Sequence, residues 1–456
     1  MSRHLVVLGG GITGLSAAWE ARRRGWSVTV IDSADRFGGK LLSSDFLGRR
    51  IDEGADAFLR RVPQGLELCA ELGLDDLVSP AATSACVWVG GELRRIPGGL
   101  VLGVPSRFDE LAGSGILTPE GLARARAEVD RRGAALAGDA GVGDVIREHY
   151  GDEVADHLVG PLLGGINAGD PDRLSIDAGV PQLAAAAHAD ASMTRALAAT
   201  PAGAPGEPVF STPRAGMGVL AETLAAALAD GGAHMLSGRE VVGLEPDGDG
   251  WSVTTASGGV GADAVIVSVP SGVAAALLSG LCPTAARHLA GIETSSVALV
   301  TLGYSLADVP RPLDASGFLV PRDAGLTLTA ASWGSSKWAH WADGRHALLR
   351  VSAGHRNDPG PAGWADDRLL EALGRDLERT MGITAAPVAT RITRWRDGFP
   401  QYDVGHVGRV AAIDRAIEDD CPGLIVTGAA HRGLGIPACI AQGREAVARL
   451  ADRAEQ

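Results

Sequence analysis

The order of elements at the start of this chain constrains its fold more than any other feature. Residues 4–8 (HLVVL) predict a short buried strand, and a glycine loop follows at once. The apolar spacing of residues 15–24 predicts a helix that Gly25 stops. Residues 27–31 (SVTVI) predict a second strand, and Asp32 comes directly after it. Strand, glycine loop, helix, strand and acid make up a dinucleotide-binding βαβ unit, so we expect a Rossmann-type α/β domain here.

Each part of this unit has a physical task. Gly9 permits the tight turn, Gly11 lets the backbone approach a pyrophosphate, and Gly14 lets the helix pack on the strand. The helix N-terminus presents free N–H groups to the phosphates. Asp32 accepts hydrogen bonds from a ribose hydroxyl. These features predict a dinucleotide but do not separate NAD from FAD.

A second glycine pair, in Arg36-Phe37-Gly38-Gly39, resembles the R-x-G-G segment of flavoproteins, and this resemblance implies FAD as the cofactor. Arg36-Phe37-Gly38-Gly39 follows the acid and predicts another close backbone approach, with Arg36 adding positive charge. By contrast, Gly259-x-Gly261 precedes a predicted strand and opens no helix, so it is not a second dinucleotide loop. Without a site for NAD(P)H, the chain does not look like a reductase linked to pyridine nucleotides.

Composition excludes several classes of function. The 456 residues are 46% apolar with a net charge of −14, so the basic stripe expected of a nucleic-acid-binding protein is missing. No apolar run reaches the ~20 residues of a membrane span. The amino-terminal segment also lacks the layout of a secretory signal. We therefore expect a cytoplasmic protein that binds no nucleic acid and has no transmembrane segment.

The five cysteines form no CxxC pair and no cluster with zinc-ligand spacing. An odd count in a cytosolic setting argues against a disulfide framework. We expect no metal site and five reduced, mostly buried thiols: Cys69, Cys86, Cys282, Cys421 and Cys439.

Shifts in pattern along the chain predict three domains. Ala-rich helical patterns fill the middle, a loose stretch at 201–208 closes them, and strand patterns follow. We expect a Rossmann-type FAD-binding domain (1–80, 208–272 and 409–456), a mixed-sheet substrate-binding domain (81–107 and 273–408) and an inserted helical domain (108–207).

Two later features bear on the site. Residues 423–428 predict a buried strand, and Pro437 sits near the start of a helix whose positive dipole would stabilise the negative charge of a reduced flavin. Five tryptophans have two possible roles, because they could line a site for a flat apolar substrate or pack in a core. They are Trp333, Trp338, Trp341, Trp364 and Trp395.

Taken together, the motifs resemble those of bacterial oxygen-dependent protoporphyrinogen and coproporphyrinogen III oxidases, flavoproteins of the amine-oxidase-like superfamily. The resemblance runs nearly end to end. It rests on GGGITGLSAA (9–18), DRFGGK (35–40), DEGADAFL (52–59), PLLGGINAGDP (161–171), TPRAGMGVLAETL (212–224), PQYDVGH (400–406) and VTGAAHRGLGIPACIAQGREA (426–446).

The resemblance implies roles for residues. Gly165 and Gly169 would form the catalytic loop against the porphyrinogen ring, and Cys439 would be structural, so FAD would be held non-covalently. The implied FAD-binding residues are Gly9, Gly10, Gly11, Ile12, Thr13, Gly14, Asp32, Ser33, Arg36, Gly38, Gly39, Lys40, Gly54, Ala55, Asp56, Val241, Trp395, Gly428, Gly435, Ile436 and Pro437. Asp52 and Glu53 are either part of this site or plain surface acids.

The implied reaction converts coproporphyrinogen III to coproporphyrin III in three two-electron steps, with O2 as acceptor, in haem biosynthesis. The arginine-rich composition favours this tetracarboxylate over protoporphyrinogen IX, which stays an alternative. His431 and Asp170 are candidates for assisting groups, and ferrochelatase is a candidate transient partner. Arginines that would pair with substrate propionates are Arg60, Arg61, Arg94 and Arg95.

Two other hypotheses remain open. A flavin amine oxidase or a carotenoid-type desaturase would share the FAD domain, and Lys337 would be the candidate lysine for an amine site, since Lys40 belongs to the glycine segment. Alternatively, this chain would be a non-enzymatic, flavin-bearing protein of the haem pathway that hands product to a ferrochelatase and catalyses no reaction itself.

Overall fold

The computed structural model describes residues 3–199 and 207–454. The chain divides into two compact units: a first unit of Met1–Ser79, Pro208–Glu293 and Val407–Gln456, and a second unit of Pro80–Glu207 and Thr294–His406. This grouping places residues 273–293 in the first unit, whereas the sequence assigned them to the substrate-binding domain. The three-domain division stays a prediction, and residues 201–206 of the loose stretch lie outside the described residues.

A five-stranded parallel sheet forms the centre of the first unit, in the order β12-β2-β1-β16-β22. The predicted amino-terminal strands and helix are confirmed. The sheet strands are β1 (His4–Leu8), β2 (Ser27–Ile31), β12 (His234–Leu236), β16 (Ala264–Val267) and β22 (Leu424–Val426).

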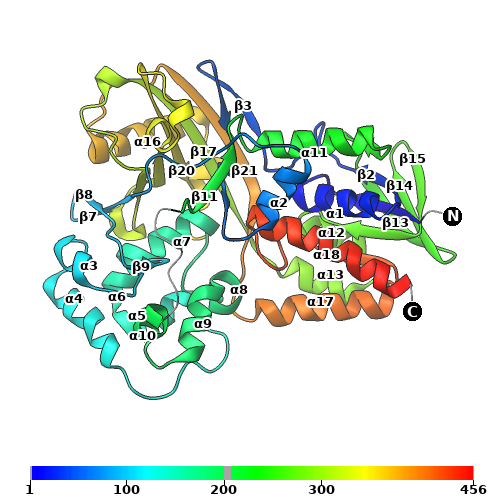
Figure 1. Cartoon of the computed structure of the whole chain (residues 1–456), viewed down its shortest axis with the longest axis horizontal. Coiled ribbons are helices and arrows are strands. Elements are labelled where there is room, and N and C mark those ends of the chain that lie inside the picture. The colour runs from blue at the N-terminus through cyan, green and yellow to red at the C-terminus, as the bar shows by residue number, and fades with distance from the viewer. Residues whose placement is uncertain (1–2, 200–206, 455–456) are drawn as a thin grey trace. The chain divides into compact units, whose positions relative to one another are not determined.

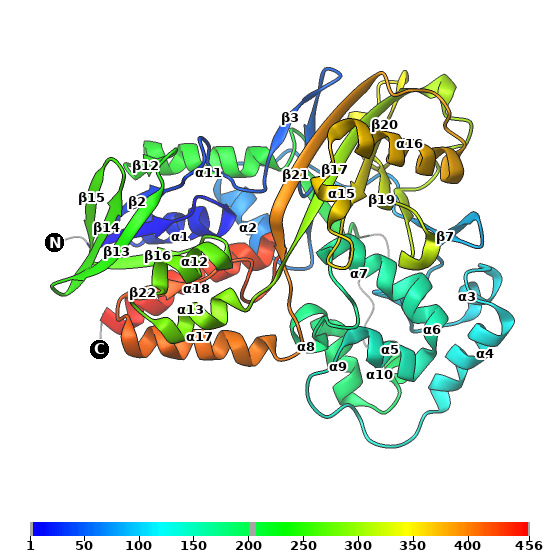
Figure 2. The same ribbon diagram turned by 180° about the vertical axis from the view of Figure 1, so that it is seen from behind.

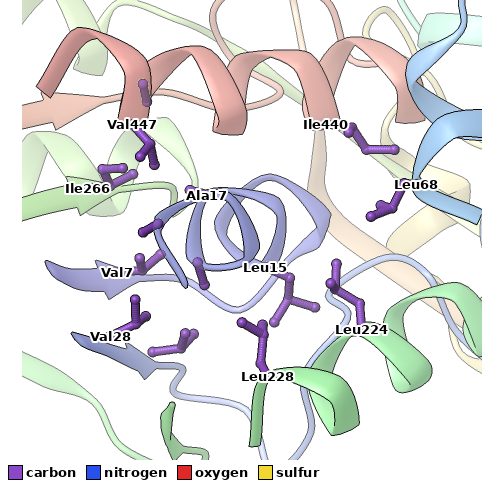
Figure 3. Close-up of a cluster of buried hydrophobic side chains, with 14 of the residues drawn as sticks. Val7, Leu15, Ala17, Val28, Leu68, Leu224, Leu228, Ile266, Ile440 and Val447 are labelled. Atoms are coloured by element: carbon purple, nitrogen blue, oxygen red, sulfur yellow. The ribbon is translucent and has the colours of Figure 1, made fainter. Parts of the chain in front are cut away.

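Both faces of this sheet are buried. Leu5 and Val7 point into one apolar cluster, whereas Val6 and Leu8 point into another, so the strand has no polar face. In the first cluster, α1 (Ile12–Arg23) packs against α11 (Gly218–Asp230) and α18 (Ile436–Ala454), as Figure 3 shows. Burial on both faces is typical of a parallel sheet, because the connecting helices cover both of its sides.

The second face is covered by helices and a hairpin sheet, visible in Figure 2. These are α12 (Ser271–Leu278), α13 (Pro283–Ala290), α17 (His406–Asp420), β13 (Val241–Asp247), β14 (Gly250–Thr255) and β15 (Gly258–Ala262). The remaining elements of the first unit are β3 (Ser43–Phe46), β4 (Arg49–Asp52), β5 (Phe58–Leu59), α2 (Gln64–Glu71), β6 (Leu77–Val78) and β11 (Phe210–Pro213).

The second unit contains a seven-stranded mixed sheet in the order β21-β17-β20-β19-β18-β7-β8. Its pairs are antiparallel except for β18 with β7. The apolar face of α16 (Asp366–Met381) covers one side of it through Leu369, Leu373 and Leu377. The strands are β7 (Cys86–Val89), β8 (Glu92–Arg95), β17 (Thr294–Ser305), β18 (Gly317–Leu319), β19 (Leu328–Trp333), β20 (His346–Ala353) and β21 (Ala389–Pro400).

A helical region also belongs to the second unit and has its own apolar core. Within it, α5 ends at Gly151, because Gly151 adopts φ +88°, a backbone conformation that residues with a side chain rarely adopt. The helices are α3 (Asp109–Gly113), α4 (Pro119–Arg126), α5 (Val142–Tyr150), α6 (Asp152–Val154), α7 (Gly160–Asn167), α8 (Ile176–Gly179), α9 (Pro181–Ala189) and α10 (Met193–Ala199).

The predicted fold class is confirmed: an α/β chain with a Rossmann-type sheet, a mixed sheet and a helical region (Figure 1). Across residues 3–199 and 207–454, every helix is too short or too polar to cross a membrane.

Candidate functional site

The glycine loop between β1 and α1 is built by two close backbone approaches. Gly9 adopts φ +101°, and its N–H donates to the Ile31 carbonyl at 2.8 Å. A Cβ on Gly14 would lie 1.9 Å from the Gly9 carbonyl oxygen and 2.6 Å from the Ser268 hydroxyl oxygen. Both glycines are therefore required by the protein's own backbone, as predicted for the turn and for helix–strand packing.

Gly11 has a different environment. A Cβ built on Gly11 would meet no protein atom within 4 Å, and Gly11 is the residue that precedes α1. The N–H groups of the first helical turn, from Ile12 onward, have no acceptor within the helix. Open space beside donor groups at a helix N-terminus fits a bound pyrophosphate.

Asp32 directly follows β2, and its carboxylate holds the glycine loop. Its Oδ2 accepts from the Gly10 N–H at 2.6 Å, and its Oδ1 accepts from the Ala34 N–H at 2.8 Å. A carboxylate offers about four acceptor positions, so two remain for a ribose. The neighbouring Ser33 is exposed.

The second glycine segment lies against the first. The Gly38 N–H donates to the Gly10 carbonyl at 2.7 Å, and a Cβ on Gly39 would lie 3.2 Å from the Gly11 Cα. The Arg36 guanidinium donates to the Gly39 carbonyl at 2.6 Å, so Arg36 braces the turn in addition to supplying charge. Lys40 follows with an exposed side chain.

The acidic segment at 52–56 separates into buried and open parts. Asp52 is 1% exposed, accepts from the Ser43 hydroxyl at 2.5 Å and accepts from the Met217 N–H at 2.8 Å. The idea that Asp52 is a surface acid is therefore wrong, because its carboxylate ties β3 to the start of α11. Gly54 and Asp56 are half-buried and Ala55 is exposed.

The segment before α18 forms another turn of the first unit. Gly428 adopts φ +126°, and a Cβ on Gly435 would meet no atom within 4 Å. Ile436 and Pro437 are the first two residues of α18, as expected of a proline at a helix start. The Gln442 side chain holds the turn, since it accepts from the Arg432 N–H and donates to the Gly433 carbonyl, both at 3.0 Å.

The cysteines and His431 are buried. All five thiols are free, as predicted. Burial raises the pKa of the Cys439 thiol, whose sulfur lies 3.7 Å from the carbonyl oxygens of Gly433 and Leu434. A neutral, buried thiol is a poor nucleophile, which fits a structural role. His431 is 3% exposed.

The predicted adenine contact lies beside the acid. The Arg239 N–H donates to the Asp32 carbonyl at 2.8 Å, and the Gly238 N–H donates to the Ala34 carbonyl at 2.7 Å. Val241 begins β13 two residues later and is half-buried. The first unit thus brings together the glycine loops, Asp32 and this strand.

Trp395, Gly165 and Gly169 belong to the second unit. Gly165 is exposed on α7 and borders a small cavity of about 30 Å³ that His355 and Arg322 also line. Gly169 is buried, and a Cβ there would lie only 2.5 Å from the Gln401 Oε1, so a larger residue would not fit.

The loop that carries Gly169 is held from the mixed-sheet region. Gln401 donates to the Asn167 carbonyl at 3.0 Å, and Arg322 donates to the Gly169 carbonyl. Burial disfavours the charge of Asp170, but hydrogen bonds from Asn357 (2.9 Å) and Arg322 (3.0 Å) outweigh it and lower the Asp170 pKa. Asp170 is therefore an anchor for the loop.

The tryptophans divide into two groups. Trp333, Trp338 and Trp341 are at most 1% exposed, so they pack in the interior and the idea that they line a substrate site is wrong. Trp364 stacks under the Arg368 guanidinium at 3.9 Å. Trp395 is half-buried on β21.

The candidate propionate-binding arginines have partners of their own. Arg60 donates to the Ser211 hydroxyl at 2.7 Å. Arg94 pairs with Glu92 at 3.2 Å, and Arg95 pairs with Asp314 at 2.8 Å.

Two residues that shape the glycine loop, and one that holds the turn before α18, were missed from the sequence. The Ser268 hydroxyl lies within hydrogen-bonding distance of the Leu8 and Gly9 carbonyls, and a Cβ on Gly443 in α18 would lie 2.2 Å from the Thr13 carbonyl oxygen. Gln442 is the third. A serine near the carboxyl end of the strand predicted after Gly261 was the available signal for Ser268, since loops at the carboxyl ends of parallel strands meet at one edge.

Comparison with known proteins places the chain among flavoproteins. The model of the "Flavin containing amine oxidoreductase" family matches residues 12–451. Coproporphyrinogen III oxidase of Bacillus subtilis is 32% identical over 98% of this chain and 97% of the relative, and that of Mycobacterium tuberculosis is 34% identical over 98% and 96%. A crystal structure from Exiguobacterium, named provisionally as a protoporphyrinogen oxidase, matches with a TM-score of 0.88 and 28% identity over all of both chains.

Proposed function

This chain belongs to the flavin containing amine oxidoreductase family, and we propose that it acts within that family as an FAD-dependent coproporphyrinogen III oxidase of haem biosynthesis. The observation that carries the proposal is similarity along the whole chain to coproporphyrinogen III oxidases at 32–34% identity. Protoporphyrinogen IX is the second candidate substrate, because the structure matched with a TM-score of 0.88 is named provisionally as a protoporphyrinogen oxidase.

The first unit would hold the cofactor. The open space at Gly11 and the N-terminus of α1 would take the pyrophosphate, and the remaining acceptor positions of Asp32 would take a ribose. The N-terminus of α18, at Ile436 and Pro437, would place a positive dipole end near the flavin ring. Bound FAD would supply the two-electron acceptor for each of three oxidation steps, with O2 as the final acceptor.

Gly165 and Gly169 would serve the substrate in different ways. The exposed Gly165 offers backbone without a side chain, so a flat macrocycle could approach it closely. The buried Gly169 would set the path of the loop, with Gln401 and Asp170 as its supports. Residues of this kind mainly position a substrate, and the cofactor carries the chemistry.

Anaerobic mixing of the FAD-loaded protein with each substrate tests the proposal. We expect coproporphyrinogen III to bleach the visible flavin band faster than protoporphyrinogen IX does, and neither putrescine nor cyclohexylamine to bleach it. Bleaching by an amine but by neither porphyrinogen would refute the proposal. Faster bleaching by protoporphyrinogen IX would reverse the substrate assignment.

The remaining parts of the proposal have their own tests. Non-covalent FAD should appear in the supernatant after acid precipitation, and use of O2 should release hydrogen peroxide during aerobic turnover. Catalysis by the purified chain would exclude the role of a non-catalytic partner. Cytoplasmic location and transient contact with ferrochelatase stay predictions.

A further inference from the structure

A cavity of the second unit is lined by none of the residues assigned above to the cofactor or the substrate. It encloses about 490 Å³, within the range of sites for small organic ligands. Its lining combines apolar and polar groups: Leu306, Val309, Pro310, Arg311, Pro312, Leu313, Ser335, Ser336, Ala342, Gly344 and His346. No acidic residue is among these lining residues, so the polar side of the cavity is cationic or neutral.

Arg311 is the unusual group in this lining. Its Nε is buried without a hydrogen-bond partner, and its Nη1 donates to the Thr380 carbonyl at 3.5 Å. Its guanidinium lies 5.6 Å from the centre of the Trp333 ring. In the described part of the chain, no carboxylate forms an ion pair with Arg311, whereas Arg95 and Arg394 each pair with an aspartate.

A partly desolvated guanidinium without a counter-charge gains more from an anion than an exposed arginine does. The fork of donors on Arg311 matches the two oxygens of a carboxylate. His346 adds a second polar group, oriented by its Nδ1 contact with Asp343 at 2.7 Å. Aliphatic groups complete the lining, since Leu306 is 41% exposed and two prolines flank Arg311 in the chain.

We propose that this cavity is a binding site for a small amphipathic carboxylate, whose anionic group pairs with Arg311 and whose apolar body lies against Leu306, Val309 and Leu313. The site does not depend on the proposed oxidase activity, because none of its residues belongs to the cofactor or substrate sites.

Calorimetric titration of the FAD-loaded full chain tests this site. The probes are indole-3-acetate and its neutral counterpart, indole-3-acetamide. We expect indole-3-acetate to bind with one equivalent per chain and the acetamide to bind at least about tenfold more weakly, because a charged hydrogen bond is lost. R311Q should weaken binding of indole-3-acetate about tenfold and leave binding of the acetamide within about twofold.

The matched control is R368Q, which alters an arginine stacked on Trp364 outside the cavity. It should bind both probes as the unmodified protein does. R311K keeps the charge without the fork and should bind indole-3-acetate with intermediate affinity, which preserves the test if R311Q fails to fold. Equal affinity for the two probes, unchanged binding by R311Q, or no binding at millimolar concentrations would overturn the proposal.

Discussion

Substitution of alanine at Gly11 and at Gly14 should separate the cofactor's needs from those of the protein backbone. The Cβ of Gly14→Ala would sit 1.9 Å from the Gly9 carbonyl oxygen, so α1 and the loop must move apart by about 1.5 Å to reach ordinary contact. Overpacking of this kind costs about 1–3 kcal/mol, and a disturbed Gly9–Ile31 hydrogen bond adds about 1 kcal/mol. We expect the apoprotein to lose about 2–4 kcal/mol.

Gly11→Ala should have the opposite profile. Its backbone (φ −73°, ψ 176°) suits alanine, and its Cβ would touch no protein atom. Alanine is a poorer N-cap than glycine by about 0.5–1 kcal/mol, but it reduces the entropy of the unfolded chain by a similar amount. Apoprotein stability should therefore stay nearly unchanged. A methyl group in the pyrophosphate space should cost about 1–3 kcal/mol of binding, a factor of roughly 5 to 150 in FAD affinity.

The assay measures two quantities for each variant. The melting temperature of the FAD-free protein should fall by about 4–16 °C for Gly14→Ala and should hardly change for Gly11→Ala. Quenching of flavin fluorescence gives FAD affinity, which should fall for both. Gly272→Ala, with open space around its Cβ in α12, is the control and should retain both properties. Normal FAD affinity in Gly11→Ala would refute the placement of the pyrophosphate, and normal melting of Gly14→Ala would refute the close approach.

Three further changes probe other parts of the molecule. Glu128→Gln should lower the melting temperature, because the buried Glu128 carboxylate bonds His149 (2.9 Å) and the N-terminal segment of α10. Burial opposes the negative charge of Glu128, but these hydrogen bonds outweigh it and lower the Glu128 pKa. Their contribution to the free energy of unfolding is therefore present above the unfolded pKa of about 4.3 and is lost as pH falls through the lower folded pKa. Circular dichroism should thus show the gap to the unmodified protein narrowing toward about pH 4, and a constant gap would contradict the pKa assignment. Gln401→Ala should reduce kcat/KM for coproporphyrinogen III at unchanged FAD content, because the carbonyls of Asn167 and Phe399 lose their donor; equal kinetics would exclude a positioning role. The Cys439→Ser variant should retain as much FAD per chain as the unmodified protein. If this variant lost its FAD, a covalent link between Cys439 and the flavin would be indicated.

The local parts of the fold could be predicted from the sequence because their causes are local. The apolar run of residues 4–8, the helical spacing that follows, and Asp32 specify strand, helix and acid within a short segment. Gly9 and Gly14 could be assigned roles because a turn and a tight helix–strand contact demand glycine wherever this unit occurs. In the structure, neither glycine leaves room for a side chain. A Cβ on Gly9 would lie 2.9 Å from the Ser268 carbonyl oxygen, and one on Gly14 would lie 1.9 Å from the Gly9 carbonyl oxygen.

The residues that the sequence missed or left open depend on contacts between distant segments. Asp52 caps the start of α11 from 165 positions away, and Ser268 lies 259 positions from the Gly9 carbonyl that it contacts. Nothing in the residues around Asp52 distinguishes a buried acid from a surface acid, since burial is decided by the helix that packs over it. The same limit applies to Trp333 and Trp341, whose burial comes from the strands and loops of the mixed-sheet region.

Gly165 and Gly169 illustrate what a family resemblance can add and what it leaves open. The resemblance assigned one task to both, a loop against the substrate ring. In the structure, Gly165 is exposed, whereas the surface of Gly169 is closed by Gln401 and its carbonyl is taken by Arg322. A side chain at Gly165 would meet mainly Leu319 at 3.3 Å and then open space, but one at Gly169 would collide with a buried amide at 2.5 Å. Bulk at Gly165 should therefore act on the substrate, and bulk at Gly169 should act on the loop, so the two glycines need different physical arguments even though one motif contains both.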